Sequence, residues 1–220
     1  MKFIKKLLPE IAMLPVLIAV YFFTRLYNIM SLPIFTDEAI YTRWAEIARF
    51  DPNWRFISLT DGKQPAFVWA DMLIMKFFSD PLLAGRMVSV FAGFITIFGI
   101  YFLTYEVFKK NNQKKARVMG IIASAIFVLY PFSLVYDRMA LYESMVAMFF
   151  VWCLYLQILL VRKVRLDVAM ILGLVLGSAV LTKSSGFLSI YLFPSLLLIF
   201  DFKNKDWKFR LLTLALFALV

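Results

Sequence analysis

Histidine is absent from this 220-residue chain, and cysteine and charged side chains are scarce. Without histidine, imidazole can serve neither as a base nor as a metal ligand, so any catalysis must use carboxylates, lysine, arginine or tyrosine. The single cysteine, Cys153, falls within a long apolar run and excludes an internal disulfide. Charged residues make up only 17% of the chain, against about 25% in soluble domains, which excludes an ordinary soluble fold.

Apolar side chains take the place of the missing charge. Hydrophobic residues make up 63% of the chain, aromatics make up 18%, and the mean hydropathy is +0.82. A helix needs about 20 apolar residues to cross the roughly 30 Å of hydrocarbon in a bilayer. Runs that reach or approach this length are 9–29, 81–107, 118–136, 140–161, 167–182 and 186–200, and a further run begins at 211. We predict an all-α polytopic membrane protein in which residues 1–220 form one domain.

The two ends of the chain need separate interpretation. The N-terminal basic and apolar stretch could be a signal peptide, but no small-x-small cleavage site follows it, which favours a retained first span. The last run, 211–220, covers only about half of the hydrocarbon, which would leave helix carbonyl groups unsatisfied in lipid. We therefore expect about six complete spans and a truncated seventh, in the front part of a longer protein.

The distribution of the net charge of +10 indicates how the chain is oriented in the membrane. Fifteen of the 24 lysine and arginine residues lie in four clusters at every second membrane boundary, namely "KFIKK" at the N-terminus, 109–117, 162–165 and 203–210. Basic residues at alternate boundaries follow the positive-inside pattern, which predicts a cytoplasmic N-terminus in a plasma (inner) membrane and no nucleic-acid partner. Residues 30–80 then form a long first outer loop.

Two surface helices are predicted within this outer loop. From Asp37 to Phe50, apolar residues recur at helical spacing, and Tyr41 and Trp44 suit the headgroup zone of a membrane surface. A second helix is expected over 65–79, with Pro65 at its first position. The segment between the two helices contains turn residues and is predicted to be irregular.

The adjacent carboxylates Asp37 and Glu38 stand where the first apolar run has ended, and they have two interpretations. At the start of a helix, carboxylates accept hydrogen bonds from free N–H groups and meet the positive end of the helix dipole. The same placement keeps Asp37 ionised, as a general base for an acceptor hydroxyl or amine must be. The residues themselves leave capping and catalysis both open.

Lys63 in "DGKQP" is the clearest candidate for binding an anion. Gly62 permits a tight turn there, and a lysine just before a helix start opposes the helix dipole, so stability does not explain it. Lys63 and the free N–H groups of the helix could converge on a phosphate. A solvated loop lysine is the alternative.

Further ionisable residues, Arg86, Arg138, Glu143 and Lys183, fall at the outer ends of apolar runs. Near such ends, each could simply reach the headgroups. Their collection on one side, together with Tyr136 in the hinge "YDRMALYES", is also consistent with an anion site that has acidic neighbours.

Taken together, these stretches resemble the polyprenyl-phosphate-dependent membrane glycosyltransferases of the GT-C class. That group includes the dolichyl-phosphate-mannose–protein mannosyltransferases and the aminoarabinose transferases that modify lipid A. The resemblance extends over the whole chain through "TDEAIYTRWAEIARF", "DGKQPAFVW", "AGRMVSVFAG", "YDRMALYESMVAMFF" and "GSAVLTKSSGFL". It implies inverting transfer of a sugar from a polyprenyl-phosphate donor, at the outer face, to an unidentified lipid, protein or glycan acceptor.

The resemblance also implies roles for individual residues. Asp37 corresponds to the base that deprotonates the acceptor, with Glu38 in support, and Lys63 to the lysine that contacts the donor phosphate. Arg138 and Lys183 correspond to positions that commonly line the site on the phosphate side. Arg86, Tyr136 and Glu143 are supporting candidates, although relatives usually carry aspartate where Glu143 stands. No cofactor is certain; the zinc dependence of the aminoarabinose enzymes does not carry over, whereas a divalent metal at Asp37 and Glu38 stays open.

Two other functions compete with this one. A transporter or lipid flippase would use the outer charges as an entry vestibule, but transporters usually place polar groups near the middle of the membrane. An inactive, truncated relative or a scaffold subunit is the third hypothesis. Sugar transfer explains the polar loop residues best.

Overall fold

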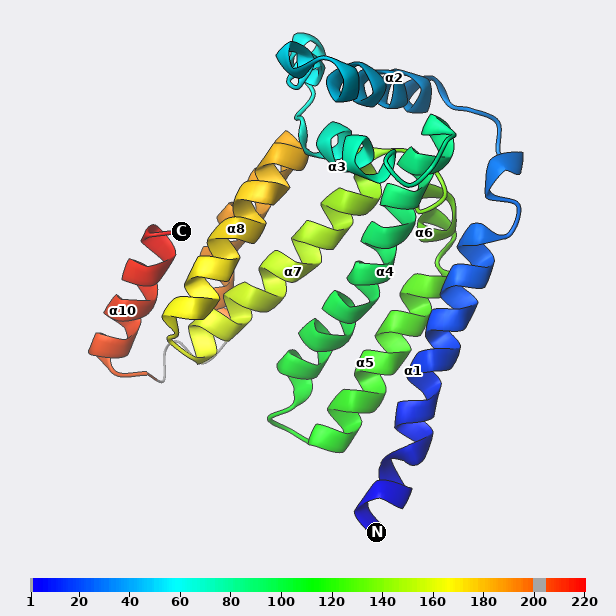
Figure 1. Cartoon of the computed structure of the whole chain (residues 1–220). Coiled ribbons are helices and arrows are strands. Elements are labelled where there is room, and N and C mark those ends of the chain that lie inside the picture. Colours follow the sequence, from blue (N-terminus) through cyan, green and yellow to red (C-terminus); the bar gives the residue numbers. More distant parts are fainter. Residues whose placement is uncertain (1, 200–204) are drawn as a thin grey trace.

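The computed structural model describes residues 2–199 and 205–220, and the described chain is helical without a strand (Figure 1). The bundle consists of α1 (Lys2–Leu26), α4 (Pro81–Phe108), α5 (Gln113–Leu129), α7 (Tyr142–Arg162), α8 (Leu166–Thr182), α9 (Leu188–Ile199) and α10 (Trp207–Ala218). Shorter elements at one end are α2 (Thr36–Phe50), α3 (Ala66–Ile74), α6 (Pro131–Tyr136) and the 3-10 turns η1 (Ile29–Ser31), η2 (Pro52–Trp54), η3 (Ile57–Asp61) and η4 (Ser184–Phe187). The predicted run end at 200 and the start of the basic cluster at 203 lie outside the described residues.

Three segments of the described chain are long and apolar enough to cross a membrane: Met13–Ser31, Pro81–Phe108 and Tyr142–Arg162. They confirm a membrane-integral, all-helical protein. The apolar helix α8 has 17 residues and is shorter than a full span, as the sequence predicted. Three of the six expected spans are therefore long and apolar enough in the structure, and the other three remain predictions.

The predicted run 118–136 is divided at Pro131. α5 begins at Gln113, where the Asn112 side chain accepts hydrogen bonds from two backbone N–H groups, and it ends at Leu129. Tyr130 is extended, with ψ at 127°, because a residue before proline is disfavoured in the helical region. Pro131 then opens the separate short helix α6, so the chain turns across the end of the bundle.

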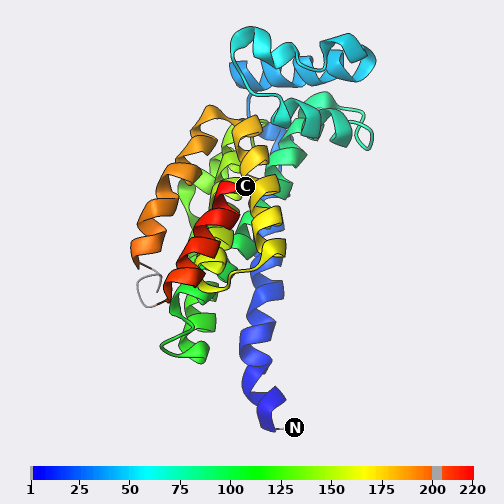
Figure 2. The same cartoon turned by 90° about the vertical axis from the view of Figure 1, so that its left-hand side faces the viewer.

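The short helices gather at one end of the bundle. Helix α2 runs crosswise over this end, with α3 between it and the long helices (Figure 1), and the turned view shows both at the same end of the bundle (Figure 2). The N-terminus and the loops after α4 and α7 lie at the opposite end (Figure 1). These loops carry basic clusters, so the structure places them together as the positive-inside pattern requires.

Helix α2 forms where predicted, and its buried face overlaps the predicted one in part. The expected apolar face was Ile40, Trp44, Ile47 and Ala48; Ala48 is buried and Trp44 and Ile47 are partly buried, but Ile40 is exposed, and the buried set also includes Tyr41 and Ala45. The two alanines let α2 approach α3 and α4 closely, and they share a cluster with buried residues of both helices. Tyr41 therefore packs inside the protein and does not occupy the headgroup zone.

A buried ion pair fixes α2 on the bundle. Glu38 and Arg86 have side chains with 0% exposure, and Arg86 Nε and Nη2 each donate to a Glu38 carboxylate oxygen at 3.0 Å. Arg86 also donates to the carbonyl oxygens of Ile29 and Leu32 in the connection before α2. Both charges are thus enclosed and hydrogen-bonded, which is the condition under which a buried pair is tolerated.

Replacing Glu38 by alanine is expected to destabilise the protein strongly, by about 3–5 kcal/mol, because the Arg86 charge is left buried without its partner. The midpoint of thermal unfolding in detergent measures this effect. The matched control is Glu46→Ala, which breaks the exposed Arg43–Glu46 pair and should cost less than about 1 kcal/mol. Equal shifts for the two variants would contradict the assignment.

Candidate functional site

A polar cavity of about 250 Å³ lies at the α2–α3 end of the bundle. Segments distant in sequence meet around it: α2, the loop before α3, the start of α7 and the turn between α8 and η4. Its lining residues are Tyr41, Gly62, Lys63, Gln64, Tyr142, Glu143, Thr182, Lys183, Ser184 and Ser185. The cavity therefore combines ammonium groups, hydroxyl groups and one carboxylate.

Two lysines border this cavity. Lys63 follows Gly62, whose φ of 69° is left-handed and suits glycine, and the turn closes with the Lys63 N–H donating to the Ser58 carbonyl oxygen. The Lys63 side chain is exposed and has no ion-pair partner in the part of the chain that the structure describes. Lys183 Nζ donates to Glu143 Oε1 at 3.0 Å, and both side chains are partly exposed. Two accessible ammonium groups of this kind suit a phosphate.

Asp37 borders the same cavity through Tyr41. It is half-buried in the first turn of α2 and is not itself a lining residue, but the Tyr41 hydroxyl donates to Asp37 Oδ2 at 3.3 Å. Burial, and next the Asp37 carboxylate, raise the pKa of Tyr41 above its ordinary value, so its hydroxyl keeps the proton that it donates. Among the described residues, the Tyr41 hydroxyl is the one side-chain donor to Asp37, and no lysine or arginine forms an ion pair with it.

Glu38 and Arg86, for which supporting site roles were predicted, form a buried contact outside the lining of the polar cavity. The Glu38 oxygens accept hydrogen bonds from Arg86 and from the backbone N–H groups of Phe35 and Ala140, at 3.0 and 2.6 Å. Glu38 is therefore the carboxylate that caps α2 through the Phe35 N–H, while Asp37, also in the first turn, lies at the positive end of the helix dipole. Because the Arg86 guanidinium is enclosed and fully bonded, it cannot reach a donor phosphate.

The same contacts also concern the possible divalent metal at Asp37 and Glu38, which the sequence neither predicted nor excluded. With both Glu38 oxygens engaged by donors, Asp37 and Glu38 do not present two free carboxylates to a cation. Within residues 2–199 and 205–220, no three cysteine, aspartate or glutamate side chains are grouped as metal ligands.

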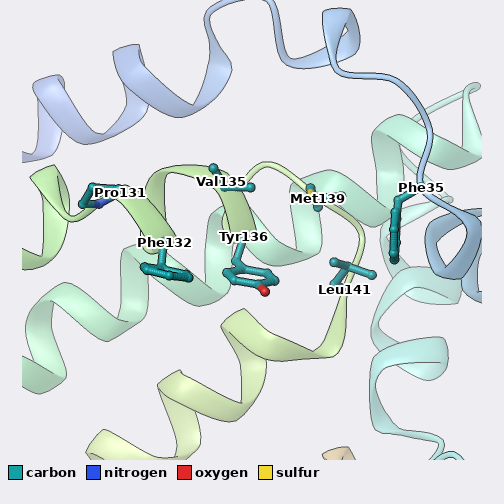
Figure 3. Close-up of a pocket in the computed structure, with 7 residues that line it drawn as sticks. All are labelled: Phe35, Pro131, Phe132, Val135, Tyr136, Met139 and Leu141. Carbon is teal, nitrogen blue, oxygen red and sulfur yellow. The ribbon is translucent and has the colours of Figure 1, made fainter.

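The predicted anion site in "YDRMALYES" is divided by the fold. Arg138 Nη2 donates to the carbonyl oxygens of Tyr27 and Asn28, at 2.9 and 3.0 Å, away from the polar cavity. Tyr136 lines a different, apolar cavity (Figure 3). Asp137, an acidic neighbour in that predicted site, forms a buried ion pair with Arg25 at 3.4 Å. Glu143 alone of this group lines the polar cavity.

Sequence reasoning missed the aromatic and hydroxyl wall of the cavity. The Tyr41 and Tyr142 rings meet edge to face with centroids 4.6 Å apart, and the Tyr142 hydroxyl donates to the Gln64 carbonyl oxygen at 2.9 Å. Tyr142 thereby ties α7 to the loop that carries Lys63. The hydroxyl residues were visible as neighbours of Lys183 in "TKSS", but only the fold places that turn against α2.

Asp71 on α3 is a second residue that the sequence did not single out. It is fully buried, and neither carboxyl oxygen has a hydrogen-bond partner in the described part of the chain. A Cβ atom on Gly85 would lie 3.1 Å from Asp71 Oδ2, so this glycine of α4 allows the close approach. Burial, and next the Glu46 carboxylate, raise the pKa of Asp71 to about 8.

The apolar bundle with crosswise helices and a polar cavity at one end is consistent with a membrane glycosyltransferase of GT-C type, and the family match supplies the evidence for that class. The sequence model of the dolichyl-phosphate-mannose–protein mannosyltransferase family matches residues 62–220, most of the chain, and the chain belongs to this family. The match confirms the predicted resemblance; it includes Lys63, Glu143 and Lys183 but begins after α2. No curated protein and no solved structure matches the chain.

Asp71→Asn should stabilise the protein increasingly as the pH rises. In the folded protein Asp71 keeps its proton up to about pH 8, whereas in the unfolded chain it loses the proton near pH 3.8. The carboxyl group therefore lowers stability as the pH rises from about 4 to 8, and the cost is complete above pH 8. The measurement is the difference between variant and wild type in the midpoint of thermal unfolding, taken from pH 5 to pH 9. Asp61→Asn, at an exposed position, is the control. If the difference for Asp71→Asn does not grow with pH, the buried, protonated state is contradicted.

Proposed function

We propose that this protein transfers a sugar from a polyprenyl-phosphate donor to an acceptor hydroxyl or amine, with inversion at the anomeric carbon. The observation that carries the proposal is the polar cavity, which Lys63, Lys183 and Tyr41 line together, with Asp37 accepting a hydrogen bond from Tyr41. A base and a cationic site for a leaving phosphate are the two minimum requirements of this reaction. Membership of the family supports the donor class.

In the proposed reaction, the acceptor oxygen or nitrogen attacks the anomeric carbon while Asp37 takes its proton. The bond between that carbon and the phosphate oxygen breaks, and the electron pair leaves with the polyprenyl phosphate. Lys63 and Lys183 balance the charge that develops on the phosphate. Glu143 holds Lys183 in place at 3.0 Å before the donor arrives. One carboxylate base is sufficient for inversion, so no second carboxylate nucleophile is needed.

We also propose that this chemistry takes place on the non-cytoplasmic side of a plasma (inner) membrane. The cavity lies at the α2–α3 end, and the basic loops lie at the opposite end of the bundle (Figure 1). Basic loops stay in the cytoplasm under the positive-inside rule, which puts the N-terminus inside and the cavity outside. A transporter is less well supported, because the polar cavity lies at the end of the bundle, away from the middle where transporters bind.

Asp37→Asn is expected to lower kcat for sugar transfer by at least about 100-fold, because the amide cannot take the acceptor proton. Transfer of labelled sugar from the lipid donor by the membrane-embedded protein measures this effect. Glu46→Gln, which alters an exposed carboxylate on the same helix, should keep wild-type kcat. Both variants should insert into the membrane normally. Unchanged transfer by Asp37→Asn would remove Asp37 as the base.

Lys63→Ala is expected to weaken binding of polyprenyl phosphate by about 10-fold or more, because a charge-assisted contact contributes on the order of 1.5–3 kcal/mol. Titration of sugar-free polyprenyl phosphate into the detergent-solubilised protein measures the dissociation constant. Lys76→Ala is the matched control, since Lys76 is also an exposed lysine of the segment between α2 and α4 but does not line the cavity. An unchanged dissociation constant for Lys63→Ala would refute the phosphate role.

A further inference from the structure

Two phenylalanine rings stay exposed where α2 and α3 end. Phe50, the last residue of α2, is 82% exposed, and Phe77, just after α3, is 79% exposed. Among the large hydrophobic side chains that the structure describes, none is more exposed than Phe50. Neither ring belongs to a segment that is long enough to cross a membrane, so lipid contact along a span does not account for them.

Arg49 brings the two helix ends together. Its Nη1 donates to the Met75 carbonyl oxygen at 2.7 Å, which joins the end of α2 to the end of α3. Its guanidinium carbon also lies 5.7 Å from the centre of the Phe50 ring. Arg49 is exposed, and its hydrogen bond goes to a neutral oxygen, so its charge can still bind an anion. Arg49, Phe50 and Phe77 are called the α2–α3 corner below.

Packing places this corner at the level of the first turn of α4. Met75 and Phe78, which flank Phe77 closely in the chain, pack in one cluster with Ala84, the fourth residue of α4. Helix α4 can span a membrane, and its 28 residues extend over about 42 Å, close to the roughly 40–45 Å of a bilayer with its headgroup layers. The first turn of α4 therefore lies in a headgroup layer, and the loop after α3 projects beyond the side of the bundle there (Figure 2).

The chemistry of the corner matches that layer. An apolar ring next to a cation is the pattern of interfacial segments, which bury phenylalanine at the boundary between headgroups and acyl chains and direct arginine to the phosphates. The lipid that surrounds α4 continues to the corner, because the two are in packing contact. The predicted headgroup residue of α2, Tyr41, is buried and cannot make this contact.

We propose that the α2–α3 corner anchors the two crosswise helices in the bilayer, with Phe50 and Phe77 inserted among phospholipids and Arg49 on a lipid phosphate. The inference does not depend on the proposed sugar transfer. It makes the bilayer a partner of the short helices as well as of the long ones. Because α2 carries Asp37 in its first turn and α3 follows Lys63, the anchor fixes the level of both residues relative to the membrane surface.

Fluorescence quenching tests the anchor. Phe77→Cys carries the fluorophore NBD in protein whose buried native Cys153 is replaced by alanine, and the protein is placed in phosphatidylcholine nanodiscs. Leu59→Cys, on η3 and 48% exposed, is the matched control. A phospholipid with a nitroxide near the top of its acyl chain should quench the label at position 77 several-fold more than the label at position 59. Iodide in the water should show the opposite order, and Phe50→Cys should behave like Phe77→Cys.

Three results would overturn the anchor. Quenching at position 77 by iodide and not by the nitroxide lipid would place the corner in water. Protection from both quenchers would show that protein covers the corner. Equal quenching by the nitroxide lipid at positions 77 and 59 would show that the corner has no preferred contact with the bilayer.

Arg49→Gln tests the phosphate contact separately. Glutamine can still donate a hydrogen bond to the Met75 carbonyl oxygen, but it brings no charge to a phosphate. Quenching of the label at position 77 by the nitroxide lipid should fall several-fold in Arg49→Gln. It should stay unchanged in Arg43→Gln, which removes an exposed arginine of the same helix that is paired with Glu46. Equal quenching in the two variants would overturn the role of Arg49.

Discussion

The buried pair between Glu38 and Arg86 is the contact on which the arrangement of the site depends. It joins α2 and the connection before it to α4, and through the Ala140 N–H it also holds the start of α7. Such a pair is expensive to bury and is tolerated only when every oxygen and N–H group finds a partner, as the Glu38 oxygens do here. Because α2 lies crosswise over the bundle, its position would otherwise rest on the packing of two small alanines and a few aromatic rings.

Charged residues at this end of the protein fall into two groups that the sequence does not distinguish. Glu38, Arg86, Asp137 and Arg25 are enclosed and paired, and they hold helices together. Lys63, Lys183 and Glu143 keep exposed surface around a cavity, where a solute can reach them. The division follows from solvation. A charged group whose hydrogen bonds are all made inside the protein cannot bind a substrate, whereas a partly hydrated charged group can replace its bound water by a group of the substrate.

Two cavities of different chemistry lie among the short elements of this protein. The polar cavity lies where α2, α7 and the α8–η4 turn meet, and the apolar one lies where Pro131 ends α5 and turns the chain into α6. Asp37 accepts a hydrogen bond from Tyr41, which lines the polar cavity. The proline that divides a predicted span therefore also lines the apolar cavity.

The sequence by itself determined the class of protein, the long apolar helices, the alternation of basic loops, the two crosswise helices and the Gly62 turn, because these depend on composition, periodicity and local backbone preference. It also selected Lys63 and Lys183, which line one polar cavity, and Asp37, which accepts a hydrogen bond from Tyr41 of that lining. It could not determine which of the two carboxylates accepts the capping hydrogen bond from Phe35, that Arg86 is enclosed, or that Tyr41 faces the protein and Ile40 faces outward. Those outcomes depend on which surfaces meet across segments more than 40 residues apart. Only the tertiary structure fixes such contacts, because burial and pairing of a side chain are properties of its neighbours in space.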